Sequence, residues 1–176
     1  MRKVVFTHGL LAGLIVSLLM VVSWFLVKPE SDLAYVAGYA GMLIALSMIF
    51  FAIKSYRDNY LGGTITWSRG FMVGLYVSII ASILYVIGWK IFSAITMPDF
   101  WDQYAKHTID AMKKHGASDA AILETTKQME GYKNMNPIVE WGMTILEIFP
   151  VGIVISLISA AILRRKAAPP IQTSVV

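Results

Sequence analysis

Residues 138–163, "IVEWGMTILEIFPVGIVISLISAAIL", form an apolar run that is long enough to cross a bilayer as a helix. Near its middle, the stretch "LEIFPVG" at 146–152 carries a carboxylate, Glu147, and a proline, Pro150. A charged group is unfavourable in lipid, and a proline removes one helical hydrogen bond. The run predicts a membrane span, and it raises the question of what Glu147 contacts.

Three further apolar runs are as long, and the four candidate transmembrane helices cover approximately 4–27, 33–53, 70–96 and 138–163. Hydrophobic residues make up 57% of the chain and charged residues only 15%, which lies outside the range of soluble domains. The first run is too long for the apolar core of a cleaved signal, so we interpret it as a retained anchor. We therefore predict an all-α integral membrane protein, a four-helix transmembrane bundle in a single domain, 1–176.

The basic residues lie beside these runs. Eight of the fifteen Lys and Arg residues fall in three clusters, namely Arg2 and Lys3; Lys54, Arg57 and Arg69; and Arg164, Arg165 and Lys166. Clusters that flank apolar spans set membrane orientation, so both termini are expected in the cytoplasm. The net charge of +4 is then no sign of nucleic-acid binding.

The segment 97–137 should lie on the opposite, extracytoplasmic side. Its pattern predicts a short hairpin of two amphipathic helices, with Gly116 ending the first and Ser118 starting the second. Asp102, Lys106 and Asp110 are spaced four residues apart, as in a solvated ladder of salt bridges. Residues 167–176 are predicted to be a disordered tail.

Two pairs of spans resemble each other. Gly9, Gly13 and Ser17 recur in the third span as Gly70, Gly74 and Ser78, and the second span can be laid on the fourth. The resemblance indicates two hairpins duplicated in parallel, related by a pseudo-two-fold axis along the membrane normal. The alternative is that spans rich in Gly, Leu and Ser resemble one another by composition alone.

Small residues repeat every four positions in every span. In the fourth span the series includes Gly152 and Ser156. Close approach over small side chains is a main source of helix association in lipid, so these stripes predict tight packing. A flexible, sliding interface is the functional alternative. Ser156 lies almost opposite Glu147 on an ideal helix, which gives the fourth span two faces unsuited to lipid.

Three charged residues are expected at depth. Glu147 lies near the middle of its span, Lys90 lies about 10 Å inside the third span, and Glu140 shares a helix face with Glu147. Lys90 in contact with Glu147 or Glu140 would satisfy all three, and we expect Glu147 to face Lys90 rather than lipid. Such a pair either fixes the register of two spans or serves as a proton or ion site. Pro150 is expected to kink the helix and open room beside Glu147.

Other chemistry finds little support. The three histidines, His8, His107 and His115, lack metal-ligand spacing, and no cysteine is present. Gly62 and Gly63 predict a tight turn, because no phosphate-binding motif surrounds them. No Ser/His/Asp set shares a compartment, so we expect no enzymatic activity, cofactor or metal.

The stretches "IKSYRDNYLGGTITW" and "LEIFPVGIVISLISAAILRRK" resemble domain-of-unknown-function family 4199, a group of small bacterial integral membrane proteins. The resemblance covers nearly the whole chain and implies a four-span protein of the bacterial inner membrane, without supplying an activity. Its sharpest points are Lys54, Ser55, Tyr56, Arg57, Gly62, Gly63, Glu147, Phe149, Pro150 and Gly152.

The sequence leads us to expect a non-enzymatic inner-membrane protein that is a structural or binding component of a membrane complex. Its expected partners are the lipid bilayer and either further copies of itself or other membrane proteins. The alternative is a small ion- or proton-coupled transporter or channel that uses Glu147 and Lys90. Neither a substrate nor an oligomeric number follows from the sequence.

Overall fold

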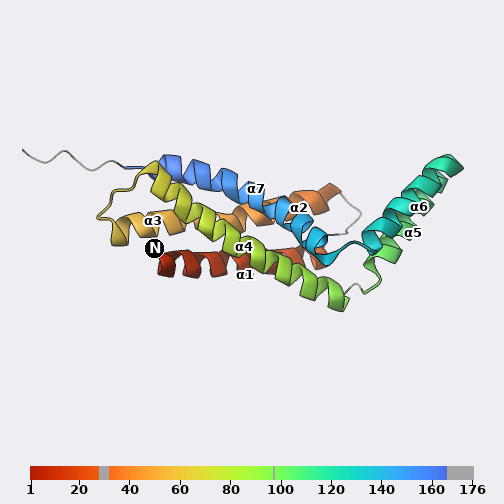
Figure 1. Cartoon of the computed structure of the whole chain (residues 1–176), viewed down its shortest axis with the longest axis horizontal. Coiled ribbons are helices and arrows are strands. Elements are labelled where there is room, and N and C mark those ends of the chain that lie inside the picture. Colours follow the sequence, from red (N-terminus) through yellow and green to blue (C-terminus); the bar gives the residue numbers. More distant parts are fainter. Residues whose placement is uncertain (28–31, 97, 166–176) are drawn as a thin grey trace, which may run out of the picture. The chain divides into compact units, whose positions relative to one another are not determined.

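The computed structural model describes residues 1–27, 32–96 and 98–165 of the chain (Figure 1). The regular structure in these ranges is helical, apart from one isolated backbone bridge. The helices are α1 (Arg2–Leu26), α2 (Asp32–Leu46), α3 (Met48–Tyr60), α4 (Trp67–Thr96), α5 (Phe100–Lys114), α6 (Asp119–Lys133) and α7 (Pro137–Leu163). The predicted tail, 167–176, lies outside the described residues.

Four of the helical stretches are long and apolar enough to cross a membrane. They cover Arg2–Leu26, Leu33–Tyr60, Trp67–Thr96 and Pro137–Leu163, and they pack together. The predicted all-α fold with four spans and a helical pair between spans three and four is confirmed. The chain is thus a multi-pass membrane protein by the length and composition of its helices.

The second span differs from its prediction, because it consists of α2 and α3 joined at Ser47. The Ser47 hydroxyl donates to the carbonyl oxygen of Ile44 at 2.6 Å. The amide of Phe50 donates to the carbonyl oxygen of Ser47 at 3.0 Å, a tighter hydrogen-bonding step than that of an α-helix. Serine bonded back to its own helix in this way commonly bends it. The span also extends to Tyr60, beyond the predicted end at 53.

One compact unit contains Met1–Tyr85 together with the chain from Ile145 onward. Within it, α1 packs against both α2 and α3. The most buried large side chains come from α3, α4, α7 and the end of α2, and include Leu46, Ile49, Ile53, Val73, Val77 and Ile148. Aliphatic side chains therefore fill the centre of this unit.

The contact between α4 and α7 in this unit is built from small residues. A Cβ atom placed on Gly74 would lie 2.6 Å from Ser156 Oγ, and one placed on Gly152 would lie 2.6 Å from Ser78 Oγ. Each glycine thus packs directly against a serine of the other helix. The hydroxyl oxygens of Ser78 and Ser156 lie 3.4 Å apart. A Cβ on Gly70 would meet Ala160. Four residues forward along α4 correspond to four residues back along α7, so the helices are antiparallel in a defined register.

The related glycines of α1 make different contacts. A Cβ on Gly9 would meet Ile80 and one on Gly13 would meet Leu84, both large side chains of α4. The Ser17 hydroxyl donates to the carbonyl oxygen of Leu84 at 3.4 Å. The equivalent stripes of spans one and three therefore pack against unlike partners. Whether a duplication produced their similarity stays a prediction.

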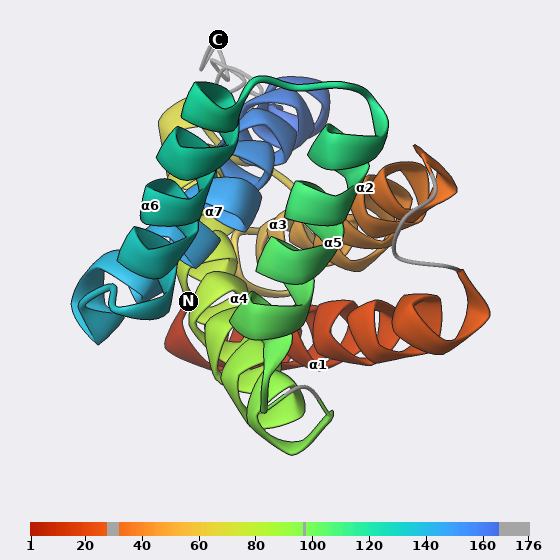
Figure 2. The same ribbon diagram turned by 90° about the vertical axis from the view of Figure 1, so that its right-hand side faces the viewer.

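The other unit, Val86–Thr144, contains the antiparallel hairpin of α5 and α6 (Figure 2). Gly116 follows α5 with φ of 74°, and the Ser118 hydroxyl accepts from the amide of Ala121 at the start of α6, as predicted. No described side chain between 98 and 136 is buried. The hairpin is thus held by its caps and by contacts between half-exposed side chains.

The salt-bridge ladder predicted along α5 is wrong for Asp102, its first residue. Asp102 pairs with Lys133 of α6, whose Nζ lies 2.7 Å from Oδ1 and 2.9 Å from Oδ2. Spacing along one helix identified Lys106 as the partner, but the antiparallel return of α6 brings a second cation to the same carboxylate. Exposed pairs contribute at most about 1 kcal/mol, so spacing within one helix does not determine the partner of Asp102.

Candidate functional site

Lys90 and Glu140 form an ion pair between α4 and α7. Both side chains are about 30% exposed, so the pair is partly shielded. Of the two carboxylates that the sequence offered to Lys90, the structure therefore selects Glu140.

Glu147 has a different environment. Its side chain is exposed, and it has no ion pair or hydrogen bond with a described residue of its own compact unit. Lys90 belongs to the other compact unit, so the expectation that Glu147 faces Lys90 stays a prediction. Glu147 lies ten residues after the first residue of α7, or about 15 Å along the helix, near the middle of a hydrocarbon core of roughly 30 Å. An unsatisfied carboxyl group thus lies at mid-span.

The exposed groups of α7 form one stripe along the helix. Leu146 is 69% exposed, Val154 is 53% exposed, and Glu147 and Pro150 lie between them on the same side. The opposite side of α7 is buried, with Ile148, Gly152, Ser156 and Ser159 among its residues. The two faces that the sequence predicted are therefore present. The small residues already pack against α4, whereas the acidic face is left uncovered.

Pro150 lies inside α7, and the helix continues through it to Leu163. Because proline has no amide hydrogen, the carbonyl oxygen of Leu146 lacks its usual donor in the helix. That oxygen belongs to the residue preceding Glu147. A carboxyl group and a backbone carbonyl without its i+4 donor therefore lie on consecutive residues of α7.

Two tyrosines and a serine add polar groups in the same unit. Tyr85 of α4 is buried and lies within electrostatic range of both Glu147 and Tyr39 of α2. One turn earlier on α4, the buried hydroxyl of Ser82 has no hydrogen-bond partner in the described part of the chain. Sequence reasoning missed these residues. They lie on separate spans, so no spacing rule could have joined them to Glu147.

Among the described residues, His, Asp and Glu side chains form no cluster of three. The two acidic groups of α7 are Glu140 and Glu147. One of them, Glu140, is already neutralised by Lys90. The chemistry left to Glu147 is to accept a hydrogen bond, to pair with a cation or to carry a proton.

The family model for DUF4199, described as a protein of unknown function, matches residues 7–165. The chain belongs to the DUF4199 family. The match spans all four apolar helices and the α5–α6 hairpin, so family membership covers the architecture described above. Searches of the curated proteins and of the solved structures gave no match.

Proposed function

We propose that this DUF4199 protein is a non-enzymatic component of a membrane complex, and that the exposed face of α7 binds a transmembrane helix of a partner. The observation that carries the proposal is the carboxyl group of Glu147, exposed at mid-span without a partner among the described residues of its compact unit. The partner is a second copy of this chain or another membrane protein.

The physical argument rests on the energy of a polar group in lipid. An ionised carboxylate facing hydrocarbon near mid-bilayer is unfavourable by on the order of 3 kcal/mol or more. A donor or cation on a neighbouring helix offsets that energy. The apolar neighbours Leu146 and Val154 supply the surface around the polar contact. The face therefore combines a specific hydrogen-bonding group with a packing surface.

The location follows from charge and family. The basic clusters at the N-terminus, around the α3–α4 connection and after α7 support a cytoplasmic location for those ends of the spans and for both termini. Together with the bacterial proteins that the sequence resembles, they support the bacterial inner membrane as the compartment. Measuring the accessibility of tags at both termini tests this orientation.

The experiment exploits the absence of cysteine from the chain. Leu146→Cys introduces one thiol on the proposed interface, and Leu18→Cys on α1 introduces one at a similarly exposed apolar position, 63% exposed. Crosslinking in native membranes should trap a complex from position 146 and little from position 18. The mass of the product distinguishes a second copy from another protein.

A second substitution tests the role of the carboxyl group. Glu147→Leu in the Leu146→Cys background should lower the crosslinking yield, whereas Glu147→Gln, which still hydrogen-bonds, should retain more of it. Equal yields from positions 146 and 18 would contradict the interface. An unchanged yield with Glu147→Leu would remove the carboxyl group from it.

A rival function, a proton- or ion-coupled transporter, is favoured by the polar groups near Glu147. Tyr85 and the Leu146 carbonyl oxygen would give a proton or cation further contacts. Proton, sodium and potassium flux into liposomes should then depend on Glu147. Flux that disappears in a stable Glu147→Gln variant would favour transport, and absence of flux from the wild-type protein would eliminate it.

A further inference from the structure

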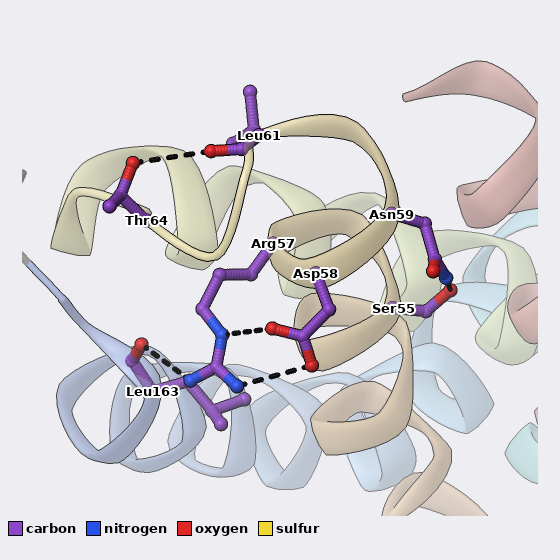
Figure 3. A network of polar contacts seen from close by, with 7 residues as sticks. All are labelled: Ser55, Arg57, Asp58, Asn59, Leu61, Thr64 and Leu163. Carbon is purple, nitrogen blue, oxygen red and sulfur yellow. Dashed lines mark hydrogen bonds and ion pairs between the residues drawn. The ribbon is translucent and has the colours of Figure 1, made fainter.

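A fixed polar network lies where α3 ends and α7 ends (Figure 3). The guanidinium group of Arg57 reaches from α3, donating from Nε to Asp58 Oδ1 at 2.6 Å and from Nη2 to Oδ2 at 3.2 Å. Its Nη1 donates to the carbonyl oxygen of Leu163 at 3.3 Å. All three nitrogens of the guanidinium group are thus engaged, and the end of α7 is held against α3.

The backbone of Arg165 is fixed at the same place. Its amide and carbonyl groups exchange hydrogen bonds of 3.0 Å each with Ile65, which is 3% exposed. Gly62 and Gly63 shape the preceding turn with φ of 61° and 82°, and the amide of Gly63 donates to the carbonyl oxygen of Arg57 at 3.0 Å. This bridge and turn determine where the Arg165 side chain begins.

Three cations surround one carboxylate in this network. Lys54, one helical turn before Asp58, and Arg165 both act electrostatically on the Asp58 carboxylate, as does Arg57. Because Asp58 is hydrogen-bonded to Arg57 through both oxygens, it leaves the other two cations uncompensated. The side chains of Lys54 and Arg165 are exposed and have no ion pair or hydrogen bond in the described part of the chain.

The orientation of the spans in the membrane requires only that positive charges lie near this end of them. The structure adds that two uncompensated cations come from different elements and that both elements are fixed to each other. Lys54 directly follows Ile53, and Arg165 lies two residues after Leu163, where the apolar runs of their spans end. Spans of this length bring such positions to the level of the lipid headgroups. A compact anion that accepts from both side chains suits this arrangement, and phosphate is such a group in every phospholipid.

We propose that Lys54 and Arg165 form a binding site for the phosphate group of an anionic phospholipid, beside the Arg57–Asp58 network. The anionic lipid supplies a second attraction that a zwitterionic lipid lacks, because its net charge is not cancelled within the headgroup. Arg57 positions the site by holding α3 and α7 together and does not contact the lipid.

The test is native mass spectrometry of the detergent-purified protein titrated with phosphatidylglycerol or phosphatidylcholine. The wild-type protein should retain phosphatidylglycerol in preference. Lys54→Gln with Arg165→Gln should lower that retention by roughly tenfold, since each basic group near an anionic surface contributes severalfold in affinity. The matched control, Lys106→Gln with Lys113→Gln on α5, removes the same charge from exposed positions and should retain lipid as the wild type does.

A charge-preserving variant separates lipid binding from folding. Lys54→Arg with Arg165→Lys should keep the preference for phosphatidylglycerol, and the melting temperatures of all variants show which are folded. Equal losses from the site and control variants would overturn the proposal. So would displacement of phosphatidylglycerol by equimolar inorganic phosphate, because the site would then bind the free anion rather than the lipid.

Discussion

Gly152→Ala tests the contact that sets the register of α4 and α7. The new Cβ atom would lie 2.6 Å from Ser78 Oγ and 2.8 Å from Ser78 Cβ, closer than real Cβ atoms come to other atoms. Ser78 is fully buried, and its hydroxyl donates to the carbonyl oxygen of Gly74 at 2.9 Å. The serine therefore cannot turn away freely. Overpacking of this kind lowers the free energy of unfolding by about 1–3 kcal/mol.

The assay is thermal unfolding of the purified protein in detergent. A chain of this size loses about 2–4 °C in Tm for each kcal/mol of stability, so the loss is measurable. Gly142→Ala is the matched control on the same helix, because its Cβ would have no neighbour within 4 Å. Alanine is favoured over glycine inside a helix by about 0.5–1 kcal/mol, so the control should be neutral or slightly stabilising.

A compensating substitution identifies the cause. Ser78→Gly removes the atoms that the new Cβ of Gly152→Ala would meet, so the double variant should recover part of the lost stability. The reasoning is refuted if Gly152→Ala unfolds at the same temperature as Gly142→Ala, since the two helices would then not approach so closely.

Three further predictions concern the remaining polar and turn contacts. Lys90→Met and Glu140→Gln should each lower stability by about 1.5–3 kcal/mol, and their double variant should lose less than the sum; additive losses would argue against the pair. Gly63→Ala should lower the free energy of unfolding by about 1–2 kcal/mol, because φ of 82° is unfavourable for alanine, and an unchanged urea midpoint would contradict it. The hydrogen bond to Asp102 raises the pKa of Lys133 in the folded protein. The contribution of the pair to the free energy of unfolding is therefore complete below the ordinary lysine pKa of about 10.4, and it is lost as the pH rises through the raised pKa. The unfolding temperatures of the wild type and of Lys133→Met, measured by circular dichroism, should therefore differ at neutral pH and converge above the raised pKa of Lys133.

Much of the fold follows from local patterns. Long apolar runs identify the four spans because hydrocarbon requires every backbone group to be bonded within the helix. The boundary between α5 and α6 follows from Gly116 and Ser118, whose roles as stop and cap depend on adjacent residues only. The break at Ser47 was missed, because a serine in an apolar run is equally compatible with an unbroken helix.

The candidate site was only partly predictable, because local patterns locate a residue along its helix but do not identify its partner on another helix. Depth along a helix is a property of the sequence, so Glu147, Lys90 and Glu140 could be identified as charged residues inside spans. Their partners depend on how separate helices are placed side by side. Glu140 and Glu147 share a helix face by spacing, but spacing could not decide that Glu140 pairs with Lys90.

The sequence by itself determined that this chain crosses the membrane on four helices, where those helices lie, and which of their faces carry small or charged residues. Only the tertiary structure decided the register, in which Gly74 receives Ser156 and Gly152 receives Ser78. A stripe of small residues repeats every four positions, so shifting one helix by a turn gives nearly the same local pattern. The close fit of each serine over the opposite glycine selects one register, and that register leaves Glu147 uncovered.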